Sequence, residues 1–148
     1  MVGAQPLVER VFTVEVPVDR AWQSLADLDA WPAWAPHIRS VSLSPSGRLG
    51  PESRGRFRFR PVGAADFVMV EWDPPRAWTW SGRALGLPIR YVHAFEREGA
   101  DRTRLRWRVE LDGGRRGPRA RLFAAVYARL IDRAWPRFRD RADDTQAP

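Results

Sequence analysis

The chain has 148 residues, of which 44% are hydrophobic, and this is a common size for one domain with its own core. It has no cysteine, which excludes disulfides and thiolate chemistry, and we expect neither a metal site nor a cofactor. The net charge of +7 comes from arginine alone, because the sequence contains no lysine. Basic chains can bind nucleic acid, but these arginines are spread along the sequence and do not form one block. We interpret them as a solvated basic surface and expect no nucleic-acid partner.

The sequence carries no sign of a membrane or secretory segment. No apolar run approaches the length of a membrane span, and the first residues lack a basic stretch followed by an apolar one. We therefore expect a cytoplasmic protein without stable membrane insertion. A single domain is predicted for residues 1–142, and residues 143–148, which have nothing to bury, are predicted to form a flexible tail.

The first elements are predicted to be a strand and two short helices. Residues 7–16 alternate between apolar and polar side chains, as in a half-buried strand. Pro17 suits the start of a helix, and apolar residues then recur at spacings of three and four from Val18 to Leu28. Residues 29–36 contain two prolines and two tryptophans and are predicted to form a second, brief helical turn.

Six further strands follow, separated by turns rich in glycine and proline. The strand at 54–60 alternates without a break, and its four arginines are predicted to face solvent while its phenylalanines face inward. The predicted strands cover residues 38–44, 54–60, 66–72, 77–82, 89–96 and 103–112.

A long helix is predicted from about Pro118 to Arg141, with one apolar stripe and a bend at Pro136. It is the only element long enough to cover the apolar face of the sheet. We therefore predict an α+β fold in which a curved, seven-stranded antiparallel sheet wraps around this C-terminal helix. A cavity is expected where the side chains of the sheet and the helix do not meet.

The aromatic residues of the strands gather on one face of the predicted sheet, because side chains alternate between the two faces. An aromatic concave surface with a few polar groups is typical of a pocket for an apolar small molecule. The side chains predicted to bind such a ligand are Phe57, Phe59, Phe67, Met69, Trp78, Trp80, Tyr91, Phe95 and Trp107 from the sheet and Phe123, Val126 and Tyr127 from the helix.

The same alternation places Glu71 and His93 on the aromatic face, with Glu71 opposite Trp78 and Trp78 opposite His93. In an enzyme these two groups would transfer protons, since burial among aromatic rings is expected to move both pKa values towards neutrality. The alternative is structural. In that case Glu71 lies near the sheet end and bonds a backbone amide or an arginine, and His93 satisfies a neighbour in the core.

Five other residues have simpler interpretations. Trp31 and Trp34, three positions apart, are predicted to hold the short helices on the sheet instead of contacting a ligand. His37 follows Pro36 and is predicted to be an exposed loop residue. Arg90 and Glu110 are predicted to lie opposite each other on the outer face, where they would form a surface ion pair.

Three runs near the N-terminus carry a resemblance to a known family: PVDRAW at 17–22, LAD at 25–27 and WPAW at 31–34. Together they resemble the opening of the polyketide cyclase/dehydrase and lipid-transport (SRPBCC) family, which belongs to the START/Bet v 1-like superfamily. Residues 71–76 are similar to its glutamate and double-proline hairpin, and residues 103–110 to its penultimate strand.

The resemblance covers roughly residues 6–141 and implies the helix-grip fold. It also implies a hydrophobic ligand, since members include aromatase/cyclases, ubiquinone-binding proteins and lipid carriers. No set of catalytic residues is carried over by position, and a shared fold does not determine function.

Three functions remain open from the sequence. The first is a protein whose cavity binds a polycyclic, polyketide-like or isoprenoid-like molecule, with possible cyclase/dehydratase activity. The second is a carrier of lipids or quinones that only binds its ligand. The third is an interaction module that uses the arginine-rich surface and has a filled core. A cavity would separate the first two from the third, and loss of turnover with retained binding on changing Glu71 or His93 would separate the first from the second.

Overall fold

One antiparallel sheet and one long helix account for most of the chain, and the computed structural model describes residues 5–144. The sheet has seven strands in the order β1-β7-β6-β5-β4-β3-β2. The strands are β1 (Gln5–Val14), β2 (Ile38–Ser44), β3 (Arg54–Phe59), β4 (Ala64–Asp73), β5 (Ala77–Ala84), β6 (Leu87–Gly99) and β7 (Arg102–Leu111). The helices are α1 (Val18–Ala26), the 3-10 turn η1 (Leu28–Ala30), α2 (Trp31–Trp34) and α3 (Pro118–Asp144).

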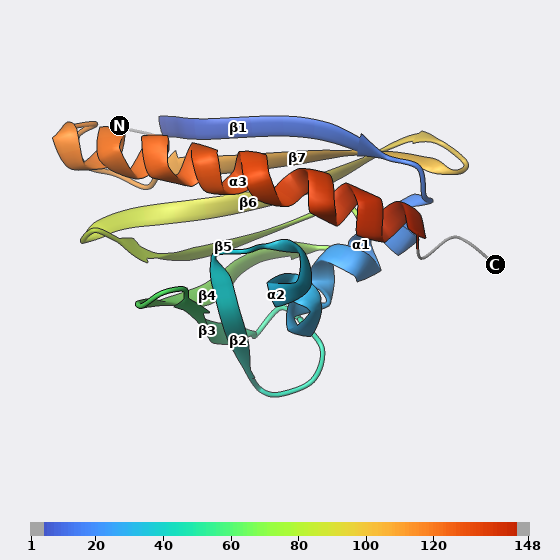
Figure 1. The fold of residues 1–148 in the computed structure, drawn as a ribbon, viewed down its shortest axis with the longest axis horizontal. Coiled ribbons are helices and arrows are strands. Elements are labelled where there is room, and N and C mark those ends of the chain that lie inside the picture. Colours follow the sequence, from blue (N-terminus) through green and yellow to red (C-terminus); the bar gives the residue numbers. More distant parts are fainter. Residues whose placement is uncertain (1–4, 145–148) are drawn as a thin grey trace.

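Helix α3 runs along one face of the sheet, beside β1 (Figure 1). The two short helices α1 and α2 lie between the end of α3 and the part of the sheet formed by β2 (Figure 1). Helix α2 contacts both α3 and β2 and so connects α3 to the far edge of the sheet. The predicted α+β helix-grip fold, with two short helices after the first strand, is confirmed.

Helix α3 extends further than its predicted end at Arg141. The carboxylate of Asp143 accepts a hydrogen bond from the backbone N–H of Glu15, at 2.9 Å, and this ties the last turn to the segment after β1. The predicted flexible tail therefore does not begin at residue 143, and residues 145–148 lie outside the described part of the chain. Pro136 lies inside the helix, and the bend expected there stays a prediction.

The hairpin between β5 and β6 is tighter than the loop predicted from the sequence. Ala84 pairs with Leu87, so that only Leu85 and Gly86 form the turn, with φ values of 53° and 76°. Two positive φ angles are characteristic of the type I′ turn, whose twist matches that of the flanking strands. The hairpin therefore extends both strands and brings the turn close to α3, where Arg119 donates a hydrogen bond to the carbonyl oxygen of Leu85 at 3.1 Å.

Candidate ligand cavity

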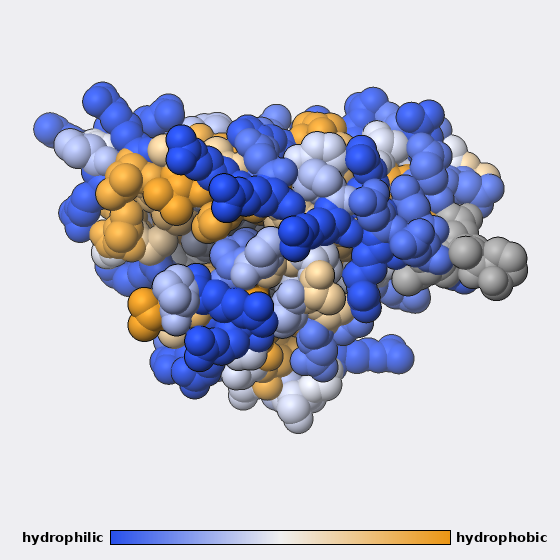
Figure 2. Space-filling view, viewed as in Figure 1, coloured by the Kyte–Doolittle hydropathy of each residue, from blue (hydrophilic) through white to orange (hydrophobic). Residues whose placement is uncertain are grey.

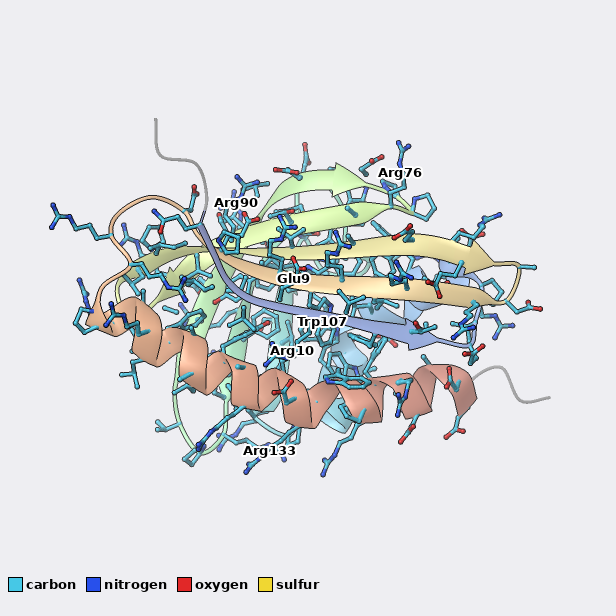
Figure 3. All side chains as sticks on the ribbon, turned by 90° about the horizontal axis from the view of Figure 1, so that it is seen from above. Glu9, Arg10, Arg76, Arg90, Trp107 and Arg133 are labelled. Carbon is cyan, nitrogen blue, oxygen red and sulfur yellow. The ribbon has the colours of Figure 1, made fainter. Side chains whose placement is uncertain are left out.

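A cavity of about 580 Å³ lies between the concave face of the sheet and α3. Sites for small molecules in proteins usually have volumes of roughly 300–1,000 Å³. Its walls are mainly apolar and rich in aromatic rings, and they include many of the side chains that were predicted to bind a ligand. These are Phe57, Phe59, Phe67, Trp80, Tyr91 and Trp107 from the sheet and Phe123, Val126 and Tyr127 from α3. Figure 3 shows Trp107 on the side of the sheet that faces α3.

The structure places three of the predicted ligand-binding residues outside this cavity. Met69, Trp78 and Phe95 are buried, and helix α1 covers the sheet at Trp78 and Phe95. The ring of Trp22 from α1 lies 4.8 Å from that of Trp78 and 5.2 Å from that of Phe95. Because α1 fills the concave face at this end, Trp78 and Phe95 contribute to the core and do not line the cavity. Met69 belongs to the same buried cluster.

Glu71 lies on the convex face, and the prediction that it shares the aromatic face with His93 is wrong. A β-bulge between Met69 and Glu71 shifts the register of β4 against β5, so that Glu71 pairs with Thr79 and Trp72 pairs with Trp78. An extra residue in one strand sends all later side chains to the opposite face. The Glu71 side chain is 62% exposed.

The carboxylate of Glu71 forms an ion pair with Arg90, which Figure 3 shows on the side of the sheet away from α3. The predicted pairing of Arg90 with Glu110 is therefore corrected. The two residues are direct neighbours across β6 and β7, but Glu110 accepts a hydrogen bond from Arg108 instead, at 3.3 Å. Glu71 therefore has the structural role that was the alternative to catalysis, in which it bonds an arginine.

His93 lines the cavity as predicted and is only 5% exposed. Its ring stacks on Trp78 with centroids 4.9 Å apart and meets Trp80 edge-on at 4.7 Å. Burial lowers the pKa of His93 to about 3, although a backbone interaction with Trp78 opposes this shift. The expected move of this pKa towards neutrality is wrong, because burial takes it well below neutrality. The imidazole is therefore uncharged at neutral pH.

Several lining residues were missed by the sequence analysis, among them both tryptophans of α2. Trp31 packs on the sheet, as predicted, with its ring 5.4 Å from that of Phe57, and its indole N–H donates to the carbonyl oxygen of Leu25 in α1 at 2.8 Å. Its ring also lies 5.6 Å from that of Trp80 and lines the cavity. Other lining residues that the sequence analysis did not predict are Trp34, His37, Arg60, Arg83, Leu85, Leu122, Leu130 and Ala134.

His37 is half-buried, and the prediction of an exposed loop histidine is wrong. Its ring stacks on Phe59 with a centroid distance of 6.3 Å. Burial lowers the pKa of His37 to about 4, so this imidazole is also uncharged at neutral pH. Burial raises the pKa values of Tyr91 and Tyr127, which line the same cavity, and the nearby Tyr91 adds to the rise for Tyr127. Both phenols are therefore protonated.

Four buried nitrogen atoms of cavity-lining residues have no hydrogen-bond partner among residues 5–144. They are Nε1 of Trp34 and Trp107 and Nδ1 of His37 and His93. A buried polar group without a partner costs about 1–3 kcal/mol, and native proteins contain few of them. Such a cluster around one cavity is suited to a ligand that carries oxygen atoms.

The described residues contain no group of three or more His, Asp or Glu side chains arranged to hold a metal ion. In the same part of the chain, no helix combines the length and the apolar character needed to cross a membrane.

Comparison with known proteins identifies the family. Residues 5–143 match the profile of the family described as polyketide cyclase / dehydrase and lipid transport. The chain belongs to this family. Comparison with curated proteins gives no match.

Solved structures share the fold of this polyketide cyclase / dehydrase and lipid-transport family member at low sequence identity. A protein from Thermobifida fusca superposes with a TM-score of 0.75 and 16% identity, covering 91% of each chain. The Zhui aromatase/cyclase from Streptomyces gives a TM-score of 0.67 and 16% identity over 93% of this chain and 91% of its own. A START superfamily protein from Mycobacterium smegmatis superposes with a TM-score of 0.68 and 15% identity, covering 90% of this chain and 97% of its own. Likeness at this level of identity concerns the fold alone.

Proposed function

We propose that the protein binds an apolar polycyclic molecule, polyketide-like or isoprenoid-like, in the cavity between the sheet and α3. The observation that carries this proposal is the aromatic cavity of about 580 Å³. Protein interiors pack as densely as organic crystals and contain few voids larger than a water molecule. A space of this size with aromatic walls is therefore a binding site and not a packing fault. The fold shared with an aromatase/cyclase supports a ligand of polycyclic type.

Binding without catalysis is favoured over cyclase/dehydratase activity by the position of Glu71. The acid–base pair on which the enzymatic hypothesis depended is divided between the two faces of the sheet. His93 remains as a neutral imidazole, which accepts a hydrogen bond from a ligand or donates one to it. In an enzyme it would act as the base. The interaction module with a filled core is disfavoured, because the core contains the cavity.

Replacing Trp80 with alanine is expected to weaken binding of pyrene roughly tenfold, because the indole forms part of the cavity wall and stacks on a polycyclic ligand. Trp72→Ala is the matched control, since Trp72 lies on the neighbouring strand of the same hairpin and outside the cavity. The measurement is a titration followed by pyrene emission. Equal losses of affinity in the two variants would contradict the proposed site.

A further inference from the structure

Two tyrosines meet where the sheet and the helix enclose the cavity. Tyr91 lies on β6, two residues before His93 and on the same face of the sheet. Tyr127 lies on α3, and the ring centroids of Tyr91 and Tyr127 are 5.8 Å apart. Both residues line the cavity. Of the described side chains that line it from α3, only that of Tyr127 contains a polar atom, because the others are leucine, isoleucine, valine, alanine and phenylalanine.

The hydroxyl groups of both tyrosines remain available to a ligand. Neither hydroxyl forms a hydrogen bond with residues 5–144. Neither oxygen belongs to the fully enclosed polar atoms without a partner, which among the described cavity-lining residues are the four nitrogens named above. Each phenol oxygen therefore still touches open space, and the open space beside these two residues is the cavity.

The two hydroxyls are close together and uncharged. The charge that Tyr91 would carry raises the pKa of Tyr127, an effect that needs a short distance between the two groups. Burial raises both pKa values, so each phenol is protonated at neutral pH and offers one O–H donor. A carbonyl oxygen has two lone pairs and can accept a hydrogen bond from each phenol. A carboxylate fits less well beside two neutral phenols, because burying a charge without a counter-charge is costly.

The opening of the cavity is apolar on the side of α3. Leu122 and Val126 line the cavity and are 57% and 50% exposed. Figure 2 shows apolar surface gathered over the first half of α3. An apolar ring system can pass along this surface, and the polar side chain that it then meets on α3 is that of Tyr127.

We propose that the hydroxyls of Tyr91 and Tyr127 together donate hydrogen bonds to one carbonyl oxygen, so that the ligand is a polycyclic aromatic ketone whose carbonyl lies between β6 and α3. The two donors distinguish such a ligand from a hydrocarbon of the same shape, because a hydrocarbon leaves both hydroxyls unpaired. This inference rests on the proposed function of the cavity and adds the chemical class of the ligand and its orientation.

The test compares two probes of nearly the same shape, 1-acetylpyrene and 1-ethylpyrene, of which only the first has a carbonyl oxygen. Binding is followed by the quenching of tryptophan fluorescence, since the chain contains eight tryptophans. The intact protein is expected to bind the ketone roughly tenfold more tightly, as two neutral hydrogen bonds would give. This preference should disappear in Tyr91→Phe/Tyr127→Phe, and each single variant should lose part of it. The C=O stretching frequency of bound 1-acetylpyrene should be higher in the double variant than in the intact protein, because hydrogen bonds to the oxygen lower it.

The control is Phe123→Leu. Phe123 stacks on Tyr127 with centroids 5.6 Å apart and lines the cavity, but it has no hydroxyl. This variant changes the wall without removing a donor, so its affinities for the two probes should change together and the preference should remain.

Three results would overturn the carbonyl site and leave the proposed function standing. The first is binding of the ketone by the intact protein that is no tighter than that of 1-ethylpyrene. The second is a preference that survives in Tyr91→Phe/Tyr127→Phe, and the third is a preference that is lost equally in Phe123→Leu. Failure of both probes to bind to the intact protein would overturn the carbonyl site together with the proposed function.

Discussion

Replacing Trp78 with alanine is expected to lower the free energy of unfolding by about 3–5 kcal/mol, as for other fully buried aromatic residues. Trp78 has no exposed surface and contacts the rings of Trp22, Phe95 and His93. It joins α1 to three neighbouring strands, and these elements cannot all close on the space that its removal would leave. The measurement is urea denaturation at neutral pH.

Trp135→Ala provides the comparison for Trp78→Ala. Trp135 is a half-buried residue of α3, and the guanidinium of Arg139 covers its ring at 5.0 Å. Its truncation should cost about 1–2 kcal/mol, because part of the ring is already in contact with water. Losses of the same size in the two variants would contradict the central position assigned to Trp78.

The stability of the protein is expected to fall by about 2 kcal/mol through His93 alone when the pH is lowered from 7 to 5. Burial lowers the pKa of His93 in the folded chain to about 3, whereas an unfolded histidine titrates near its usual value of 6.5. Below pH 6.5 the unfolded chain therefore binds a proton that the folded chain rejects until about pH 3. The uncharged form is favoured by folding, so this contribution is present at neutral pH and is lost progressively on acidification.

Comparison with His93→Phe isolates this effect, since the carboxylates and His37 titrate in both proteins. The loss of stability between pH 7 and pH 5 should be about 2 kcal/mol smaller in the variant. His93→Gln removes the same titration in a polar side chain of different shape and should show the same difference. Parallel pH dependences of the intact protein and both variants would contradict the burial of His93.

Much of the fold could be predicted from the sequence, because its local patterns are regular. Alternation and turn signals predicted all seven strands, and the single apolar stripe predicted α3. One cross-strand pairing of the site was also predicted, because it needed only alternation and the turn between the two strands: Trp78 lies opposite His93, as expected.

The position of Glu71 was not predictable, because the β-bulge in β4 depends on packing between distant parts of the chain. Trp72 turns inward to meet Trp22 of α1, with ring centroids 5.2 Å apart, and the register shift that allows this contact turns Glu71 outward. The burial of His37 likewise depends on a contact between separate segments, the stacking of its ring on Phe59. Alternation within one strand carries no information about such contacts.

The central claim is that an aromatic cavity between sheet and helix binds the ligand, and filling it tests this most directly. Leu130 lines the cavity from α3, whereas its neighbour Arg129 is exposed. The measurement is the affinity for pyrene of Leu130→Trp beside that of Arg129→Trp, with the stability of both variants checked by urea denaturation. We expect Leu130→Trp to remain folded and lose at least tenfold in affinity, because the indole occupies the ligand's space, while Arg129→Trp binds as the intact protein does. Undiminished binding by a folded Leu130→Trp variant would contradict the account.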